Sequence, residues 1–161
     1  MLKDILSISG YSGLYKYIKK SRNGIIVEHL ETKKRMNVDP TARINALEDI
    51  SIYTDNEDMA LENVFRAIYK HEDGKPAMNP KKASAKELKE YFGTVIPEYD
   101  TERVYNSDIK KILTWYNQLL KFDLISLEDK EEKKEDQKEE SDSNNNKQEE
   151  DKDNNNEKEE K

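Results

Sequence analysis

Two stretches near the N-terminus alternate apolar and polar residues in the way that half-buried β-strands do. They cover residues 13–20 (GLYKYIKK) and 24–31 (GIIVEHLE), and the dipeptide Asn23-Gly24 lies between them. Asn-Gly is the strongest short signal for a two-residue type I′ turn, because both central positions of that turn need a positive φ. A third short strand, residues 35–38, follows a second tight turn. The pattern therefore predicts a meander of three antiparallel strands.

The expected turn fixes a register for the first hairpin. With Asn23-Gly24 at its tip, Lys19 faces Glu28 and Lys16 faces Glu31. Both faces of the paired strands then carry apolar side chains, and such a sheet is normally covered on both sides. We therefore expect an α+β fold, in which a small, strongly bent antiparallel sheet or SH3-like barrel has a helix packed on it.

Helical spacing appears further along the chain. Residues 41–49 are expected to form one or two helical turns, and residues 50–54 alternate again as a strand. Apolar residues then recur with a 3.6-residue period over residues 59–72, which predicts a helix that ends at Asp73-Gly74.

Two more helices are predicted in the second half of the chain. Ser84 and Glu87 have the spacing of a capping box, which opens a helix that Pro97 closes. Ser107 is expected to cap the next helix, whose apolar stripe runs from Ile109 to Leu120.

Breaks in periodicity suggest the domain layout. Residues 74–82 contain a glycine, two prolines and no regular pattern, so they are expected to be a linker. The linker would separate a barrel-like domain with its helix, residues 1–73, from a helix–loop–helix unit, residues 83–122. Residues 123–161 are expected to be a disordered acidic tail of low complexity, because such a sequence buries too little apolar surface to offset the entropy of ordering.

Charge is distributed very unevenly. Residues 129–161 hold 15 acidic residues and 8 lysines, and their difference of −7 equals the net charge of the whole chain. Residues 1–128 therefore carry 20 acidic and 20 basic residues. Because nucleic-acid binders usually show a basic excess, this balance disfavours that class.

The chain contains no cysteine, which excludes disulfides and thiolate chemistry and fits a reducing compartment. No apolar run approaches the length of about 20 residues that a membrane helix needs. We expect a cytoplasmic protein without a membrane partner.

Several segments resemble a family of uncharacterised small proteins from Bacteroidetes bacteria, known as a domain of unknown function. The resemblance rests on MLKDILSISG followed by GLYK, on NGIIVEHLETKKR, on ALEDISIYT and on IPEYDTERVYNSDIKKILTWYN. It covers roughly residues 1–122. It implies a cytoplasmic bacterial protein with a two-part layout and brings no reaction, cofactor, partner or functional residue.

Catalytic chemistry finds little support in the sequence. The two histidines, His29 and His71, lack the spacing of a metal site, and the chain has neither a P-loop nor a dinucleotide-binding glycine pattern. We therefore expect a protein that is not an enzyme and that needs neither a cofactor nor a metal.

Protein binding is the leading hypothesis. An adaptor or binding module would contact another protein through the turn formed by Lys33, Lys34 and Arg35 and through the aromatic edge at Trp115, because aromatic and arginine anchors dominate protein interfaces.

Nucleic-acid binding is the alternative. Tyr11, Tyr15 and Tyr17 would stack on bases beside the lysine-rich turns of an RNA- or ribosome-associated module, with the acidic tail as an autoinhibitory competitor. Against this, Tyr15 and Tyr17 are expected to pack under the helix at residues 59–72, and the tail serves equally well as a solubility segment.

Overall fold

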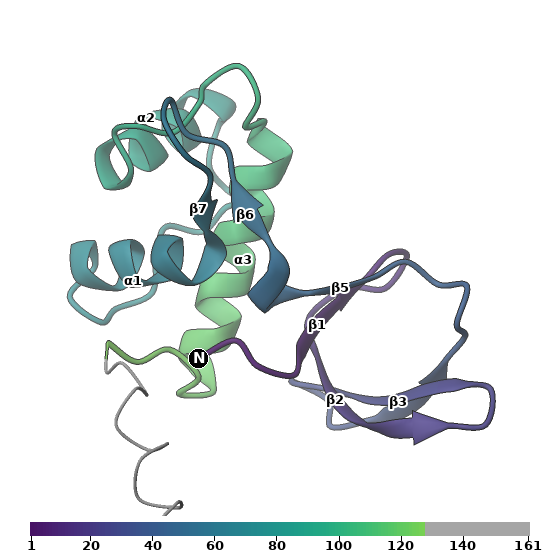
Figure 1. The fold of residues 1–161 in the computed structure, drawn as a ribbon. Coiled ribbons are helices and arrows are strands. Elements are labelled where there is room, and N and C mark those ends of the chain that lie inside the picture. Colours follow the sequence, from purple (N-terminus) through teal and green to yellow (C-terminus); the bar gives the residue numbers. More distant parts are fainter. Residues whose placement is uncertain (128–161) are drawn as a thin grey trace, which may run out of the picture. The chain divides into compact units, whose positions relative to one another are not determined.

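A five-stranded antiparallel sheet forms the N-terminal part of the protein. The computed structural model describes residues 1–127 and shows an α+β fold (Figure 1). The strands are β1 (Ile5–Ile8), β2 (Tyr15–Ser21), β3 (Gly24–His29), β4 (Arg35–Val38) and β5 (Ile44–Ala46), in the order β4-β3-β2-β1-β5. The expected bent antiparallel sheet is confirmed. A closed SH3-like barrel is not formed, because β4 and β5 stay at opposite edges of the sheet.

The inner face of the bent sheet has its own small core. Five buried side chains make up this core: Leu6, Ile8, Tyr15, Val27 and Val38. Tyr17 is partly buried against the same cluster. The sheet therefore covers one of its apolar faces by curling, and the tyrosines do not lie under the helix expected at residues 59–72.

Three helices form the second part of the protein. They are α1 (Leu61–His71), α2 (Ala85–Val95) and α3 (Asn106–Lys121), preceded by a 3-10 turn, η1 (Leu47–Asp49), and by a small hairpin of β6 (Ser51–Ile52) and β7 (Met59–Ala60). One continuous core joins buried residues of all three helices to Leu2, Ile5, Leu14 and Leu30 from the strand region. The helices thus cover the outer side of the sheet where β1 begins.

The first hairpin differs from its predicted register. Lys16, not Lys19, lies opposite Glu28, and the register shifts between Tyr17 and Lys19. Gly24 adopts φ +134° and lies against β4, where an added Cβ would be 1.9 Å from the carbonyl oxygen of Val38. The glycine is required by this close approach of a third strand, and not by a type I′ turn.

Two other local predictions were wrong. Residues 44–46 form strand β5, which pairs with β1, and only residues 47–49 are helical. Tyr105, not Ser107, is the N-cap of α3, and its backbone N–H donates to the Asp108 carboxylate at 3.0 Å. The capping box of Ser84 and Glu87 is confirmed by both of its hydrogen bonds.

The segment at residues 74–82, expected as a linker, is tied to α3. The Asn117 amide group accepts from the backbone N–H of Ala77 at 2.8 Å and donates to its carbonyl at 3.3 Å. The Tyr116 hydroxyl donates to the carbonyl of Lys75 at 3.0 Å. Ala77 is also buried in the helical core. Contacts in this core join α1, which precedes the segment, to α2 and α3, which follow it.

The chain that follows α3 returns to the helical core. Ile125 is buried and Leu124 packs against the same cluster. The backbone N–H of Ser126 donates to the sulfur of Met1 at 3.4 Å. The expected disordered tail begins at residue 123, and its part from residue 128 onward lies outside the described residues.

Replacing Gly24 is expected to destabilise the fold strongly. In Gly24→Ala the new Cβ meets backbone atoms of Val38, and we expect a loss of about 3 kcal/mol or more in the free energy of unfolding. Gly10→Ala is the matched control, because Gly10 also has a positive φ but has no atom within 4 Å of a new Cβ. The control should lose only about 1 kcal/mol. Urea denaturation measures both losses, and equal losses would contradict the close approach.

Tyr116 makes stability depend on alkaline pH. Burial, followed by the charges of Glu72 and Tyr69, raises the pKa of Tyr116 to about 12, whereas an unfolded tyrosine titrates near pH 10. The unfolded chain therefore loses this proton first, and the free energy of unfolding should fall as the pH rises from about 10 to 12. Urea denaturation at several pH values should show a shallower fall for Tyr116→Phe than for the wild-type protein. Tyr105→Phe, at an exposed ring, should match the wild type, and an unchanged fall in Tyr116→Phe would contradict the assignment.

Candidate binding groove

A groove of about 500 Å³ lies between the β1–β2 turn and α3. We call it the α3 groove. One wall is residues 7–13 together with Asn45 of β5, and the other wall is a single face of α3. The residues of that helical face are Lys110, Lys111, Thr114 and Trp115. The lining contains two lysines and no carboxylate.

The β1–β2 turn is held by backbone hydrogen bonds. The N–H of Ser9 donates to the carbonyl of Arg43 at 3.0 Å, and the N–H of Tyr11 donates to the carbonyl of Ile8 at 3.1 Å. Gly10 and Gly13 both have positive φ values, which let the chain reverse twice within a few residues. The Tyr11 side chain is left 56% exposed at the mouth of the groove.

Gly13 brings the turn against the sheet and α3 at the same time. A Cβ on Gly13 would lie 2.6 Å from Nε2 of His29 and 3.4 Å from Nε2 of Gln118. The Nδ1 atom of His29 accepts from the backbone N–H groups of Glu31 and Thr32. His29 therefore supports the turn between β3 and β4 and fills the space beneath Gly13.

The helical wall follows from the geometry of α3. Residues four apart lie on the same face of a helix, which places Lys110 beside Thr114 and Lys111 beside Trp115. The Thr114 hydroxyl donates to the carbonyl of Lys110 at 2.7 Å, while both lysine side chains are exposed. Trp115 is partly buried against the helical core and so presents only part of its ring to the groove.

A second, smaller pocket of about 250 Å³ continues the groove and shares Lys111 and Trp115 with it. Its far end is formed by Tyr53 and Arg103, whose guanidinium lies 4.3 Å from the centre of the Tyr53 ring. Arg103 Nε also donates to Asp100 at 2.7 Å. This hydrogen bond, with those from the backbone N–H groups of Arg103 and Glu102, lowers the pKa of the Asp100 carboxyl.

The charge therefore changes along the two joined pockets. The α3 groove carries Lys110 and Lys111 without an opposing carboxylate. The second pocket has Arg103 and one carboxylate, Asp108, in its lining beside the shared Lys111, and Arg103 is paired with Asp100 outside the lining. A ligand that occupies both pockets would meet only positive charge at one end and charges of both signs at the other.

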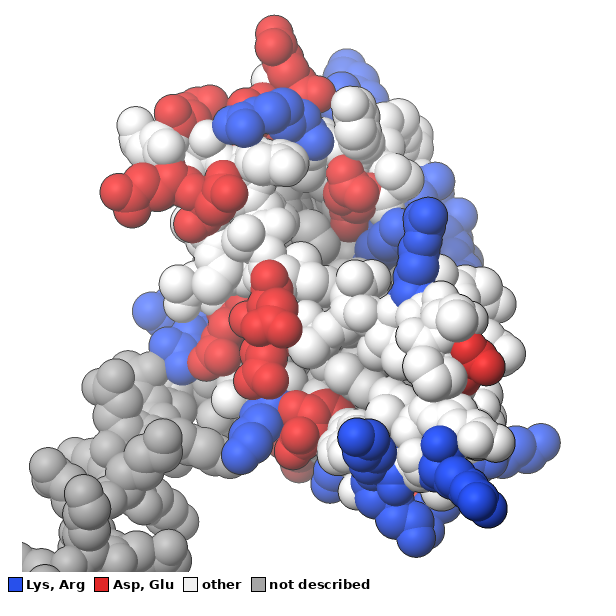
Figure 2. Space-filling view, turned by 45° about the vertical axis from the view of Figure 1, so that its right-hand side comes forward, with Lys and Arg blue, Asp and Glu red and all other residues white. Residues whose placement is uncertain are grey.

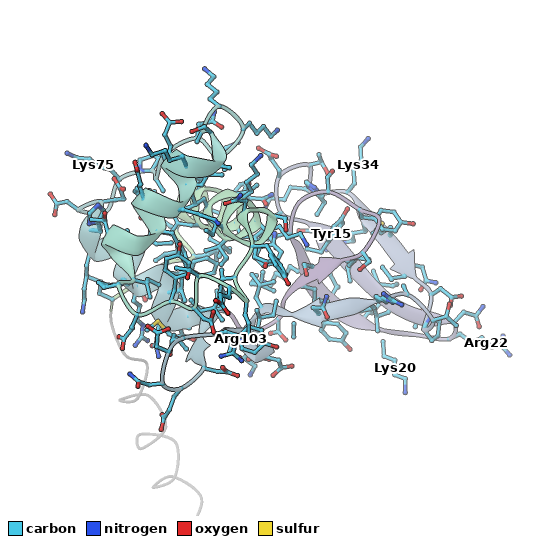
Figure 3. All side chains as sticks on the ribbon, turned by 90° about the horizontal axis from the view of Figure 1, so that it is seen from above. Tyr15, Lys20, Arg22, Lys34, Lys75 and Arg103 are labelled. Carbon is cyan, nitrogen blue, oxygen red and sulfur yellow. The ribbon has the colours of Figure 1, made fainter. Side chains whose placement is uncertain are left out.

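Two of the residues predicted to bind partners come together in the groove, namely Tyr11 and Trp115. Tyr15 is only 6% exposed, and Tyr17 belongs to the inner core of the sheet. Burial, with a smaller contribution from the neighbouring Tyr11, raises the pKa of Tyr15. The three tyrosines therefore do not form one exposed stacking surface; Figure 3 shows Tyr15 directed inward, while the labelled lysines extend outward.

The turn between β3 and β4 lies elsewhere and makes contacts of its own. Lys33 adopts φ +59° and places its ammonium 4.9 Å from the centre of the Phe122 ring. Arg35 pairs with Glu28 at 2.9 Å. Phe122 follows the end of α3, about 10 Å along the helix from Trp115 at 1.5 Å per residue. Lys33 and Arg35 are thus not part of the α3 groove, and Lys34 is exposed beside them.

Several groove residues were not identified from the sequence, including Ser7, Asn45, Thr114 and Tyr53. Lys111 and Trp115 are four residues apart and so share one helical face, and this spacing could have identified the helical wall of the groove. No sequence pattern indicated that the β1–β2 turn would lie opposite this face, because the two segments come from opposite ends of the described chain.

Neither a metal cluster nor a membrane-spanning helix is found in the described part of the chain. Residues 1–127 contain no group of three or more histidine, aspartate or glutamate side chains placed to hold a metal ion. Within the same residues, no helix has both the length and the apolar character needed to cross a bilayer.

Comparisons with known proteins identify the family. Residues 2–47 match the domain of unknown function DUF5606, and residues 50–119 match the domain of unknown function DUF6852. These regions meet at η1, where the sheet ends and the helical part begins. Among curated proteins none matches the chain.

A solved structure supports the same assignment. A structural-genomics target from Bacteroides vulgatus, whose solution structure was determined by NMR, is 46% identical and superposes with a TM-score of 0.67. The match covers 78% of this chain and 90% of that chain. The resemblance inferred from the sequence is confirmed: the chain carries two domains of unknown function and belongs to the same family as the Bacteroides vulgatus protein.

Proposed function

We propose that this protein is a non-catalytic, cytoplasmic binding module that holds an extended, acidic segment of another protein in the α3 groove. The observation that carries the proposal is the groove itself, in which Tyr11 and Trp115 flank two exposed lysines and no carboxylate lines the wall.

The lining suits a polypeptide. Trp115 offers an apolar surface and Tyr11 an exposed ring, and aromatic residues of this kind are frequent anchors of protein interfaces. Ser7, Asn45 and Thr114 add hydroxyl and amide groups that can hydrogen-bond to a peptide backbone. Lys110 and Lys111 supply the positive charge that selects carboxylates.

The change of charge along the joined pockets favours a peptide over a nucleic acid in this groove. A nucleic-acid strand carries a phosphate at every unit, so its charge would also meet the Asp108 carboxylate of the second pocket, where the charge of Arg103 is already paired with Asp100. A peptide can place its acidic residues at the lysines and neutral or apolar residues beyond Trp115. Electrostatic complementarity of this kind contributes specificity and association rate more than affinity.

Acidic peptides should bind and should change the emission of Trp115, which is the single tryptophan of the chain. We would titrate the full-length protein with tryptophan-free decapeptides in which acidic residues alternate with leucine. Matched peptides carry glutamine or lysine at the acidic positions. We expect saturable binding of the acidic peptide, at least roughly tenfold weaker binding of the glutamine peptide and none of the lysine peptide. Equal responses to all three peptides would contradict the proposal.

Charge reversal in the groove should remove this preference. Lys110→Glu/Lys111→Glu is expected to weaken binding of the acidic peptide by about tenfold or more, because it turns the attraction into repulsion. Lys86→Glu/Lys89→Glu on α2 is the matched control, since these lysines are also exposed but do not line the groove. Fluorescence titration of both double variants measures the effect. Equal weakening in both would show that net charge, and not the groove, governs binding.

The aromatic wall can be tested in the same titration. Tyr11→Ala should weaken acidic-peptide binding, whereas Tyr105→Ala should leave it unchanged, because Tyr105 is 65% exposed but lines neither pocket. Unchanged binding by Tyr11→Ala would remove Tyr11 from the site.

A further inference from the structure

The balanced charge of residues 1–128 conceals two oppositely charged parts. Residues 1–47 contain nine lysines and arginines and four acidic residues, a net charge of +5. Residues 48–128 contain 11 basic and 16 acidic residues, a net charge of −5. The division falls at η1, where the five-stranded sheet gives way to the helical part. Figure 2 shows lysine and arginine side chains along the side formed by the sheet, with most acidic side chains over the helices.

The strand register places part of this charge on the outer face of the sheet. Residues paired directly across strands share a face, so Lys16, Glu28 and Arg35 form one row across β2, β3 and β4. In the next outer row, Lys19 lies opposite Ile26. Tyr15 and Tyr17 point to the opposite, inner face.

The turns at the two ends of β3 each add one more exposed cation. Arg22 is exposed at the β2–β3 turn, and Lys34 is exposed at the β3–β4 turn. Figure 3 shows both side chains directed away from the sheet. We call the set of Lys16, Lys19, Arg22, Lys34 and Arg35 the basic face.

Little on this face neutralises its charge. Glu28 is the acidic residue of the paired rows, and it is engaged by Arg35 at 2.9 Å. Within residues 1–127, Lys16, Lys19, Arg22 and Lys34 form no ion pair with a carboxylate. Lys16 on β2 and Arg35 on β4 lie in one row two strands apart, which is roughly 10 Å at about 4.8 Å per strand. This separation is close to the Debye length of about 8–10 Å, so their fields partly add.

The composition of the face indicates the type of ligand. Lysine is depleted from the cores of protein interfaces, which need aromatic or aliphatic anchors. Of the three tyrosines expected to stack on bases, Tyr15 and Tyr17 lie on the inner side of the sheet and Tyr11 lines the α3 groove. A surface of exposed cations without stacking rings suits the regularly spaced phosphates of a nucleic acid and does not read its bases.

We propose that the basic face binds the phosphate backbone of nucleic acid without sequence preference. This site is separate from the α3 groove and goes beyond the proposed function: the protein would connect a nucleic acid on its sheet to a partner protein in its groove. The proposal differs from the nucleic-acid hypothesis drawn from the sequence, in which three tyrosines stack on bases, because here only cations contact the nucleic acid.

The test is binding of the full-length protein to a 20-base-pair DNA duplex of random sequence over a salt series. Each phosphate contact contributes about −0.9 to the slope of log K against log salt. Four or five contacts on the basic face predict a slope of roughly −4. Two duplexes of unrelated sequence should bind equally. Absence of binding at 50 mM salt, or a strong preference for one sequence, would overturn the proposal.

Charge-reversal variants locate the site. Lys16→Glu/Lys19→Glu should reduce the affinity for the duplex by about tenfold or more. It should also make the salt slope less negative by about 2. Lys75→Glu/Lys82→Glu, at exposed positions in the helical part, makes the same change in net charge and should have little effect. Equal losses in the two variants would overturn the proposal, because they would show attraction by net charge alone.

Two further measurements distinguish the basic face from the α3 groove and from a surface that attracts any polyanion. Lys110→Glu/Lys111→Glu should keep the salt slope of the wild-type protein, and a slope reduced as far as in Lys16→Glu/Lys19→Glu would place the duplex in the groove instead.

Polyglutamate serves as a polyanion that is not a nucleic acid. If it competes with the duplex as well as unlabelled DNA does at equal charge concentration, the preference for phosphate is overturned.

Discussion

Burial of one face of α3 is the constraint on which the rest of the structure depends. Ile109, Ile112, Leu113, Tyr116 and Leu119 are all buried along this helix, in the core that joins α1, α2 and the first strands. Removing any one large side chain from such a core costs about 2–5 kcal/mol, a large part of the stability of a domain of this size. Displacing α3 would therefore disrupt the packing of both the sheet and the helical part.

Polar residues near the end of the same helix connect it to other segments. Asn117 binds the backbone of the segment before α2, Gln118 lies against Gly13 of the β1–β2 turn, and Lys121 pairs with Glu31 beyond β3 at 2.7 Å. These residues follow Trp115 along the helix, so the packing that fixes α3 also fixes the wall of the groove. The basic face lies on the part of the sheet that these contacts leave exposed. One helix thus sets which part of the sheet is covered, which part borders a groove and which part faces solvent.

Local signals predicted the helices well, whereas tertiary contacts decided the strands. The box of Ser84 and Glu87 and the apolar period of α3 depend on neighbours a few residues away, and both were confirmed. The hairpin register was wrong because the strand has an irregularity near Ile18 and because Gly24 serves a contact with Val38.

Contacts between distant segments also account for the remaining differences. Strand β5 was mistaken for a helix because its partner, β1, lies far away in the sequence. The groove was not predicted: Tyr11 was selected for nucleic-acid binding and Trp115 for protein binding, and nothing local indicated that they line one surface. The neutral total charge of residues 1–128 likewise hid the basic sheet, because a sum over the chain cannot show where the charges are placed.

The central claim is that the β1–β2 turn and α3 form the two walls of one preformed groove. Since the chain has no cysteine, Ser12→Cys gives a single site for a nitroxide label on the turn. NMR spectra of the labelled full-length protein should show strong paramagnetic broadening of the backbone amide signals from Lys110 to Trp115, relative to a diamagnetic analogue of the label. If those signals keep their full intensity, the two walls do not face each other in solution and the account of the groove is wrong.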